Sequence, residues 1–242
     1  MTDKRQMIAK NIAGMLRDGD LVNLGVGIPT LVGNYISSDI QILLHGENGC
    51  VGQERELKTP WNVEDRDSVV DWLRAHGDEG GDWRTGHRDL NNASDELITL
   101  IPGACCFNSS ISFAMARGGH LDATVLGGLQ VDEEGSLANW TVPGKMVNGM
   151  GGAMDLVSGA KRVIVAMEHC SRKGEPKLVR RCTMPLTGLR CVDTLVTELC
   201  IVEFSGGGPL VTAMTPGLTR EALQARTGAR LTFSSQLRTM EE

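Results

Sequence analysis

The chain has 242 residues, enough for one large domain or two small ones with a substantial apolar core. Its 41% apolar and 22% charged residues are typical of soluble globular proteins, although only 4% of residues are aromatic. The formal net charge of −6 and the lack of a basic stripe argue against a nucleic-acid-binding surface. No stretch approaches the ~20 apolar residues of a membrane span, and the N-terminal segment has no signal-peptide core. We therefore expect a cytoplasmic protein that does not contact membranes.

The cysteines give no sign of a metal site. None of the seven forms a C-x-x-C pair, and the cytoplasm keeps most thiols reduced, so we expect no bound metal. The adjacent pair Cys105-Cys106 has no histidine or other base at a supporting spacing. For this pair we expect structural burial rather than a role as nucleophile.

Helical and strand patterns alternate along the chain. Apolar residues at helical spacing predict an opening helix, and short apolar runs predict buried strands between later helices. The last helix has a capping residue, Thr219, and Gly228 beyond its end. We predict helices at 3–18, 30–36, 109–117, 151–160 and 219–227. We predict strands at 21–25, 40–45, 96–102, 121–131, 162–169, 196–204 and 209–216, the last two as a hairpin, and a strand-turn segment at 178–188. This alternation predicts an α/β fold with an open, largely parallel sheet flanked by helices.

One segment, at about 53–90, departs from this alternation. It is charged and glycine-rich, and it contains three of the four tryptophans, Trp61, Trp72 and Trp83. Long loops in compact domains are usually functional or disordered, and three indoles argue against simple disorder. We interpret 1–242 as a single domain with an insertion at about 53–90.

A lone carboxylate, Glu47, follows the strand predicted at 40–45, in the sequence His-Gly-Glu-Asn-Gly. In open α/β sheets, ligands bind at the carboxyl ends of the strands. Gly46 and Gly49 carry no side chains, so another molecule can approach the backbone closely. A carboxylate placed in this way can act as a nucleophile and form a covalent acyl intermediate.

The segment 23–30 reads Asn-Leu-Gly-Val-Gly-Ile-Pro-Thr. Gly25 and Gly27 match half of a dinucleotide-binding fingerprint, but the third glycine and the acidic residue that should follow are missing. We therefore do not expect a nicotinamide cofactor. Backbone N–H groups at the start of the next helix would still make a favourable anion site.

A second glycine cluster, Gly149-Met-Gly-Gly152, comes just before the helix predicted at 151–160. The simple interpretation is a tight turn into that helix. The alternative is a pair of backbone donors for an oxyanion, because amides at a helix N-terminus stabilise developing negative charge.

Together these segments resemble the B (beta) subunit of family I CoA-transferases, the group of 3-oxoacid, acetoacetate and 3-oxoadipate CoA-transferases. The motifs that carry the resemblance are HGENG, NLGVGIPT, ARGGHLDATVLGGLQV, LANWTVPGKMVNGMGGAMDLVSGAKRVIVAMEH and TMPLTG. They cover most of 1–52 and 88–232. The resemblance implies an α/β sheet shared with ribose-5-phosphate isomerase-like proteins.

The resemblance also implies a mechanism. The family carries a Glu in a Ser-Glu-Asn-Gly motif that aligns with Glu47. That carboxylate attacks an acyl-CoA thioester to give an acyl-glutamyl anhydride, and the released CoA thiolate then gives a glutamyl-CoA thioester and a free acid. A second acid reverses these steps in a ping-pong scheme. The scheme uses coenzyme A thioester as a substrate and needs neither a metal nor a permanently bound cofactor.

Partners and further site residues follow from the same resemblance. The active enzyme pairs this subunit with a separate A subunit, usually as an α2β2 heterotetramer, with the site between them and an acyl-CoA and a carboxylic acid as substrates. Gly152 is the expected backbone donor, with Gly149 beside it. The residues expected to bind substrate are Asn23, Gly25, Gly27, Asn48, Gly49 and Asp95.

The sequence departs from the family pattern at three places. Gly46 replaces the Ser of the Glu motif, and Asp95 stands where the family usually has a Lys. The loop that contains the tryptophans is extended. The charge reversal either removes an attractive partner for an anionic acid or is compensated by a cation of the insertion, such as Lys58, Arg84 or Arg88. We therefore keep open an acyl-CoA hydrolase, in which water or an internal nucleophile intercepts acyl-Glu47, and a non-catalytic assembly role.

Overall fold

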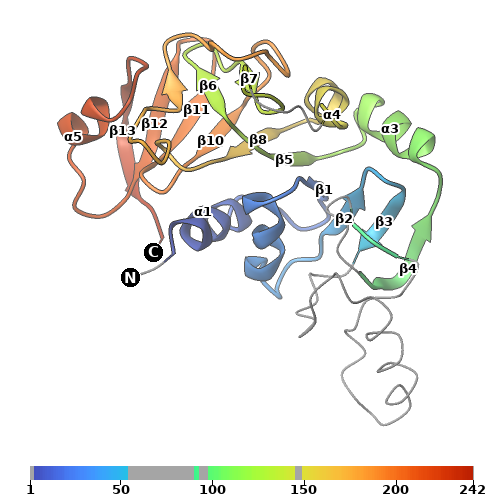
Figure 1. Ribbon diagram of the computed structural model, residues 1–242. Coiled ribbons are helices and arrows are strands. Elements are labelled where there is room, and N and C mark those ends of the chain that lie inside the picture. The colour runs from blue at the N-terminus through green and yellow to red at the C-terminus, as the bar shows by residue number, and fades with distance from the viewer. Residues whose placement is uncertain (1–2, 54–89, 93–97, 145–148, 242) are drawn as a thin grey trace.

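A computed structural model describes residues 3–53, 90–92, 98–144 and 149–241 (Figure 1). Nearly all of the insertion lies outside these residues, so its expected form is not tested. Within the described residues, no helix has the length and apolar character needed to cross a membrane.

The fold is built on one ten-stranded sheet with the order β13-β12-β11-β10-β8-β5-β1-β2-β3-β4. The five central strands, from β10 to β2, are parallel. Antiparallel pairing continues the sheet through β3 and β4 on one side and through β11 and β12 on the other, where β13 is added parallel to β12. The strands are β1 (Leu21–Leu24), β2 (Leu43–Gly46), β3 (Cys50–Gln53), β4 (Leu100–Cys106), β5 (Ala123–Gly127), β8 (Val163–Ala166), β10 (Thr194–Val196), β11 (Cys200–Phe204), β12 (Pro209–Met214) and β13 (Thr232–Thr239). The predicted open, largely parallel α/β sheet is confirmed.

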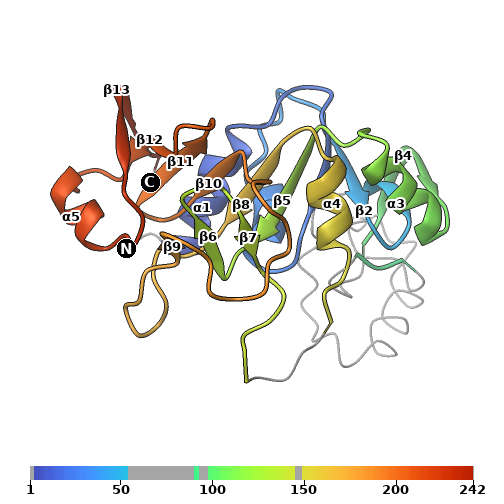
Figure 2. The same cartoon turned by 90° about the horizontal axis from the view of Figure 1, so that it is seen from above.

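Helices cover both faces of this sheet (Figures 1 and 2). The elements outside the sheet are α1 (Lys4–Ala13), the 3₁₀ helix η1 (Ile28–Tyr35), α3 (Ser109–Arg117), α4 (Ala153–Gly159), α5 (Arg220–Ala225) and a small sheet of β7 (Leu137–Ala138), β6 (Gln130–Asp132) and β9 (Leu178–Val179). One apolar cluster lies beneath α1 and η1. The other joins α3, α4, α5 and the small sheet. Alternate residues of the buried strands supply the two clusters, as the period of a strand requires.

Local signals in the sequence set several boundaries. Asn108 and Thr219 cap α3 and α5 by accepting hydrogen bonds from Ile111 N and Ala222 N. The predicted cap at Thr219 is thereby confirmed. The two ends of the chain meet, because the Asn11 side chain exchanges hydrogen bonds of 2.8 and 3.2 Å with the backbone of Glu241.

Three expectations are corrected. The strand predicted at 121–131 is two strands in different sheets, because the chain leaves the large sheet at Gly127-Gly128, where a Cβ on Gly128 would lie 2.8 Å from Val165. The helix predicted at 30–36 begins at Ile28 and is a 3₁₀ helix. Cys105 and Cys106 are exposed rather than buried, because β4 is the last strand of the sheet.

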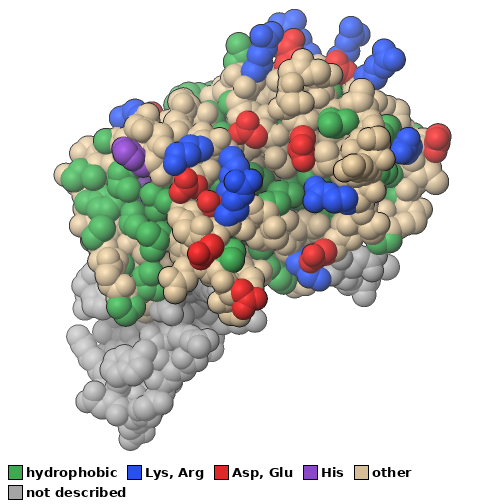
Figure 3. Space-filling model, turned by 180° about the vertical axis from the view of Figure 1, so that it is seen from behind, with side chains coloured by type: hydrophobic (Ala, Val, Ile, Leu, Met, Phe, Trp, Pro, Cys, Tyr) green, Lys and Arg blue, Asp and Glu red, His purple; other side chains and the backbone are tan. Residues whose placement is uncertain are grey.

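The face of the molecule seen from behind has an apolar part and a charged part (Figure 3). Apolar side chains gather on the flank formed by β4 and α3, while charged side chains are spread over the rest of that face. Exposed apolar residues of this kind include Ile111 of α3, which is 48% exposed.

Candidate active site

Glu47 lies in a tight turn between β2 and β3. The turn is closed by a 2.9 Å hydrogen bond from Gly49 N to Gly46 O. Gly49 has a φ of +129°, and a Cβ there would lie 2.1 Å from the carbonyl oxygen of Phe107. Only glycine fits this position. The strand after Glu47 was not expected from the sequence, which indicated a loop.

Three polar residues form a row across the sheet beside this turn. Asn23 of β1 is in register with His45 of β2 on one side and with Thr124 of β5 on the other. Residues in register on neighbouring strands point to the same face, here the face covered by α3 and α4. All three are buried, at 1%, 2% and 0% exposure respectively. The chain runs from β1 to β2 on one side and later returns to β5 on the other. The row thus lies where the strand order reverses, the usual ligand position in such sheets.

Hydrogen bonds connect this row to Glu47. Asn23 Nδ2 donates to Glu47 Oε2 over 3.1 Å, and Thr124 Oγ1 donates to Asn23 Oδ1 over 3.2 Å. Thr124 thereby orients the Asn23 amide so that its NH₂ group faces the carboxylate. Among the described residues, Asn23 is the hydrogen-bond partner of Glu47, and it leaves Oε1 available for a reaction.

His45 belongs to the support of the site. Its Nε2 lies 2.8 Å from Ser112 Oγ, whose own proton is donated to Gly46 O over 2.9 Å. His45 Nε2 must therefore carry the proton, and Nδ1 is left as an acceptor toward Asn23 Nδ2 at 3.4 Å. Burial lowers the pKa of His45, against the opposing effect of a hydrogen bond with the backbone of Ser112. Since Nε2 is held by Ser112 and Nδ1 faces Asn23, and a lowered pKa weakens its basicity, this neutral imidazole supports the turn rather than accepting a proton from a substrate.

Burial also shifts the pKa of Glu47, the candidate nucleophile. Desolvation raises the pKa of the Glu47 carboxyl above its ordinary value, and the hydrogen bond from Asn23 opposes that rise by stabilising the charged form. A carboxylate with a raised pKa is more basic and, when ionised, a better nucleophile than one in water.

Gly152 is brought against Glu47 from a distant part of the sequence. It is buried and is the N-cap residue of α4. A Cβ on Gly152 would lie 3.8 Å from Glu47 Cδ and 2.4 Å from Cε1 of Phe113 in α3. Because its φ is an ordinary −87°, this close packing, and not backbone strain, is what requires glycine.

The other predicted residues lie in different surroundings. Gly25 N donates to Val125 O over 2.8 Å and so continues the β1–β5 pairing. Gly27 is exposed and precedes η1, and Gly149 is exposed ahead of the turn into α4. The Asn48 side chain donates to Asn91 O over 2.7 Å. Asp95 lies outside the described residues, so its position relative to Glu47 is not tested.

The Gly46 departure has a structural correlate. A Cβ on Gly46 would lie 2.1 Å from Gln53 Nε2, 2.8 Å from Asn48 Oδ1 and 3.0 Å from Cys50 Sγ. The ends of these side chains occupy the space that a serine would need. Gln53 thus puts an amide beside the position where the resemblance implies a hydroxyl.

Sequence reasoning missed Ser112, Thr124 and Phe113. The available signal for the two hydroxyls was a polar residue among apolar ones, Thr124 in Ala-Thr-Val-Leu at 123–126 and Ser112 between Ile111 and Phe113. Ser112 and Thr124 are both 0% exposed, and buried hydroxyls need partners.

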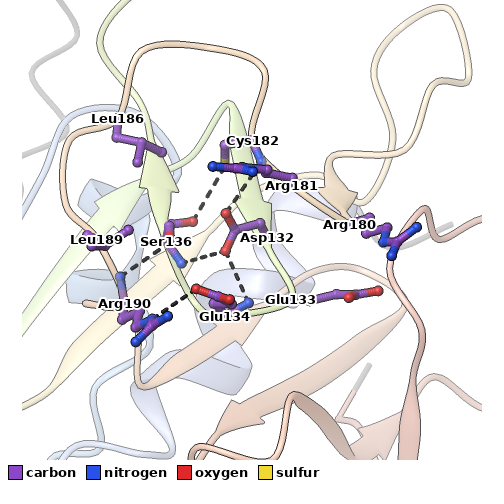
Figure 4. Close-up of a pocket in the computed structure, with 10 residues that line it drawn as sticks. All are labelled: Asp132, Glu133, Glu134, Ser136, Arg180, Arg181, Cys182, Leu186, Leu189 and Arg190. Atoms are coloured by element: carbon purple, nitrogen blue, oxygen red, sulfur yellow. Dashed lines mark hydrogen bonds and ion pairs between the residues drawn. The ribbon is translucent and has the colours of Figure 1, made fainter.

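A cleft of about 760 Å³ lies elsewhere, between the β6–β7 turn and the segment 180–190 (Figure 4). Asp132 organises it, accepting hydrogen bonds from the backbone N–H groups of Glu134, Ser136 and Cys182 at 3.1, 2.9 and 3.4 Å. Glu47 is not among the residues that line it. Within the described residues, no cluster of histidine, cysteine and carboxylate side chains suited to a metal was found.

Replacing Asp132 by alanine should lower the free energy of unfolding by roughly 3 kcal/mol, because hydrogen bonds to a buried charged group are strong and their donors would lose their partner. Urea unfolding followed by circular dichroism measures this. Glu133→Ala is the matched control on the same turn. It removes a single exposed hydrogen bond, from Arg230 N, and should change the free energy far less. Equal stability of the two variants would contradict the structural role of Asp132.

The chain is similar to known proteins both in sequence and in fold. The family described as "Coenzyme A transferase" matches residues 86–226. The chain is 47% identical over 237 residues to the beta subunit of the acetate CoA-transferase of Escherichia coli (strain K12), covering 98% of this chain and 97% of that protein. It is 43% identical over 225 residues to the B-type subunit of the succinyl-CoA:3-ketoacid coenzyme A transferase of Helicobacter pylori (strain J99), covering 93% and 97%.

Longer proteins contain a similar region. The human mitochondrial succinyl-CoA:3-ketoacid coenzyme A transferase 2 is 42% identical over 242 residues, which span 99% of this chain and 42% of that protein. The E. coli acyl-CoA transferase YdiF has the same fold, with a TM-score of 0.70 and 17% identity, and here too this chain spans only 43% of the solved one. Glutaconate coenzyme A-transferase from Acidaminococcus fermentans gives a TM-score of 0.64 at 19% identity, with 99% and 89% of the two chains covered.

Proposed function

Because the chain belongs to the coenzyme A transferase family, we propose that it is the B-type subunit of a CoA-transferase in which Glu47 carries first the acyl group and then CoA. The observation that supports this proposal most directly is the position of Gly152. Gly152, at the start of α4, lies against the half-buried carboxylate of Glu47, although the two residues are about a hundred positions apart in the chain. Asn23 orients that carboxylate by a hydrogen bond.

In the first half-reaction, Glu47 Oε1 attacks the carbonyl carbon of an acyl-CoA thioester. The C–S bond breaks, CoA leaves as its thiolate, and an acyl-glutamyl anhydride remains. Asn23 holds the other carboxylate oxygen, so it keeps the attacking oxygen oriented. The backbone N–H of Gly152 is the proposed donor to the oxyanion, and such a donor is typically worth ~3–4 kcal/mol in the transition state.

The thiolate then attacks the carbonyl carbon of Glu47 itself. The C–O bond of the anhydride breaks, the first acid leaves as a carboxylate, and a glutamyl-CoA thioester is formed. A second carboxylate attacks this thioester, and the same two steps run in reverse to give the new acyl-CoA and free Glu47. No net proton transfer is needed, which fits a site whose histidine is neutral and used for support.

The proposed partner is an A-type subunit on a separate chain, as the names of the bacterial relatives imply, and we propose an α2β2 assembly. The proposed substrates are a short acyl-CoA and a carboxylic acid. Acetate and the succinyl-CoA/3-ketoacid pair are the first candidates, because the relatives are named for them.

The test is to trap the intermediate. The purified chain and its A-type partner are incubated with acetyl-CoA or succinyl-CoA, treated with borohydride or hydroxylamine, digested and examined by mass spectrometry. Modification of Glu47 and exchange of CoA onto added acetate or acetoacetate are expected. Consumption of acyl-CoA without exchange would favour the hydrolase, and the absence of turnover by the wild-type pair would leave only an assembly role.

Replacing Asn23 by leucine should lower kcat/KM about tenfold to a hundredfold, the usual worth of a hydrogen bond to a charged group. The acid limb of the pH profile of kcat/KM should also move to higher pH. The Asn23 hydrogen bond favours the ionised form of Glu47, so its removal raises the pKa further and less carboxylate is present at a given pH.

Thr124→Val is the matched variant, because it keeps the shape and removes only the hydroxyl that orients Asn23. Thr124→Val should move the acid limb of the pH profile of kcat/KM to higher pH as well, but by a smaller amount. A pH profile that stays in place in both variants would exclude Asn23 as the residue that tunes Glu47.

A further inference from the structure

Two cysteines on neighbouring strands face each other beside the Glu47 turn. Cys50, the first residue of β3, is in register with Cys106, the last residue of β4. Antiparallel neighbours in register point to the same face, so both sulfur atoms lie on one side of the sheet. Cys105 is in register with Val51 and points to the opposite side.

The hydrogen bonds around this pair define its geometry. Phe107 N donates to Gly49 O over 2.9 Å, which joins the residue before Cys50 to the residue after Cys106. This pattern makes Cys50 and Cys106 a non-hydrogen-bonded antiparallel pair, in which the Cα atoms are ~4.5 Å apart and the side chains are closest. Disulfides join cysteines whose Cα atoms are ~4.4–6.8 Å apart, so this position can accept one.

The two thiols differ in exposure. Cys50 is 4% exposed, and its sulfur lies against Gly46, directly before Glu47 in the chain. Burial raises the pKa of the Cys50 thiol, against the opposing hydrogen bond from Gln53. Cys106 is exposed on the last strand of the sheet, where a small reagent can reach it.

We propose that Cys50 and Cys106 form a reversible disulfide that switches off the Glu47 site. The oxidant is a low-molecular-weight disulfide of the glutathione class. The Cys106 thiolate attacks one of its sulfurs and releases the first thiolate, which leaves a mixed disulfide on Cys106. The Cys50 thiolate then attacks the Cys106 sulfur and releases the second thiolate. Two protein thiols are oxidised, and one disulfide is reduced to two thiols.

The bond would change the site through the backbone. Cβ atoms of facing antiparallel residues are ~4.5–5.5 Å apart, whereas a disulfide holds them at ~3.5–4.5 Å. The Cβ atoms must therefore approach each other while the Cα atoms, already at the short end of the disulfide range, cannot, so the bond would twist the two strands next to the Gly46–Gly49 turn. A displacement of ~1 Å at a reacting group can cost ~10²-fold in rate. This effect on catalysis rests on the proposed role of Glu47, whereas formation of the bond does not.

The full-length chain is incubated with oxidised glutathione, alkylated, digested without reduction and examined by mass spectrometry. We expect the Cys50 and Cys106 peptides to be linked, with the loss of two hydrogen atoms. After removal of the oxidant and addition of the A-type partner, CoA-transferase activity should be about a hundredfold lower, in line with such a displacement. Dithiothreitol should restore it.

Cys106→Ser and Cys105→Ser are the matched variants, since both change one exposed thiol of β4. Cys106→Ser should form no link and keep its activity after oxidation, and Cys105→Ser should behave like the wild type. A link through Cys105, glutathione that remains on Cys106 without a link, or a linked protein with full activity would each overturn the proposal. An inactive reduced protein that still forms the link would instead contradict the proposed function.

Discussion

Replacing Glu47 by glutamine is expected to lower kcat/KM of the assembled enzyme by at least about 10⁴-fold, the scale seen when a covalent nucleophile is removed. The amide has nearly the same shape and can still accept the hydrogen bond from Asn23, so the loss would come from the missing nucleophile. Rates of acetyl transfer from acetyl-CoA measure it. Glu47→Asp, which keeps the charge but withdraws it from the site, is the companion variant.

The same substitution should stabilise the fold. Burial raises the pKa of Glu47 in the folded chain, so ionising it there is less favourable than in the unfolded chain. This penalty is absent below the unfolded pKa, grows between the two pKa values and is complete above the folded one. Glu47→Gln removes it. The variant should therefore melt above the wild type at neutral pH, and the gap should close as the pH falls below the ordinary carboxyl range. A Glu47→Gln variant that is inactive because it is unfolded would instead melt below the wild type.

Replacing Gly152 by alanine is expected to lower kcat/KM by about 10²–10³-fold, the effect of losing one oxyanion donor. The added Cβ would lie 2.4 Å from Phe113, so α4 must shift and carry the Gly152 N–H away from Glu47. The overpacking should also lower the free energy of unfolding by about 1–3 kcal/mol. Steady-state kinetics and urea unfolding measure the two effects separately.

Phe113→Leu provides the control for this result. Alone it should fold and retain most of the activity, because leucine keeps an apolar side chain beside Gly152 and removes no polar group from the site. Combined with Gly152→Ala, it makes room for the methyl group and should restore both stability and rate. Full activity of Gly152→Ala alone would remove Gly152 from the mechanism.

The fold class and family could be predicted because their signals are local. Apolar runs, caps such as Thr219 and the long glycine motifs are each read from neighbouring residues, and the comparisons and the structure confirm the family and the open α/β sheet. The immediate sequence around Glu47 and the glycine cluster at 149–152 also indicated a site, whereas the resemblance to the family singled out Gly152.

What could not be predicted depends on pairing between distant strands. β3 is four residues long, and its Cys-Val-Gly-Gln sequence has little strand character of its own, so only its pairing with β2 and β4 defines it. Thr124 supports Asn23 because the register of β1 against β5 places them side by side. A one-residue slip would turn every such side chain to the other face, and no local pattern records the register.

The meeting of the two chain ends has a consequence for how such subunits can be connected. Asn11 fastens the last residues to the first helix, and both termini lie at the side of the molecule away from β2 and β3 (Figures 1 and 2). A linker attached at either end would thus leave the Glu47 turn undisturbed. Covalent tethering of a second polypeptide, or joining the two ends and opening the chain elsewhere, is compatible with this architecture. A region of this kind can for the same reason form part of a protein more than twice as long, as in the human relative.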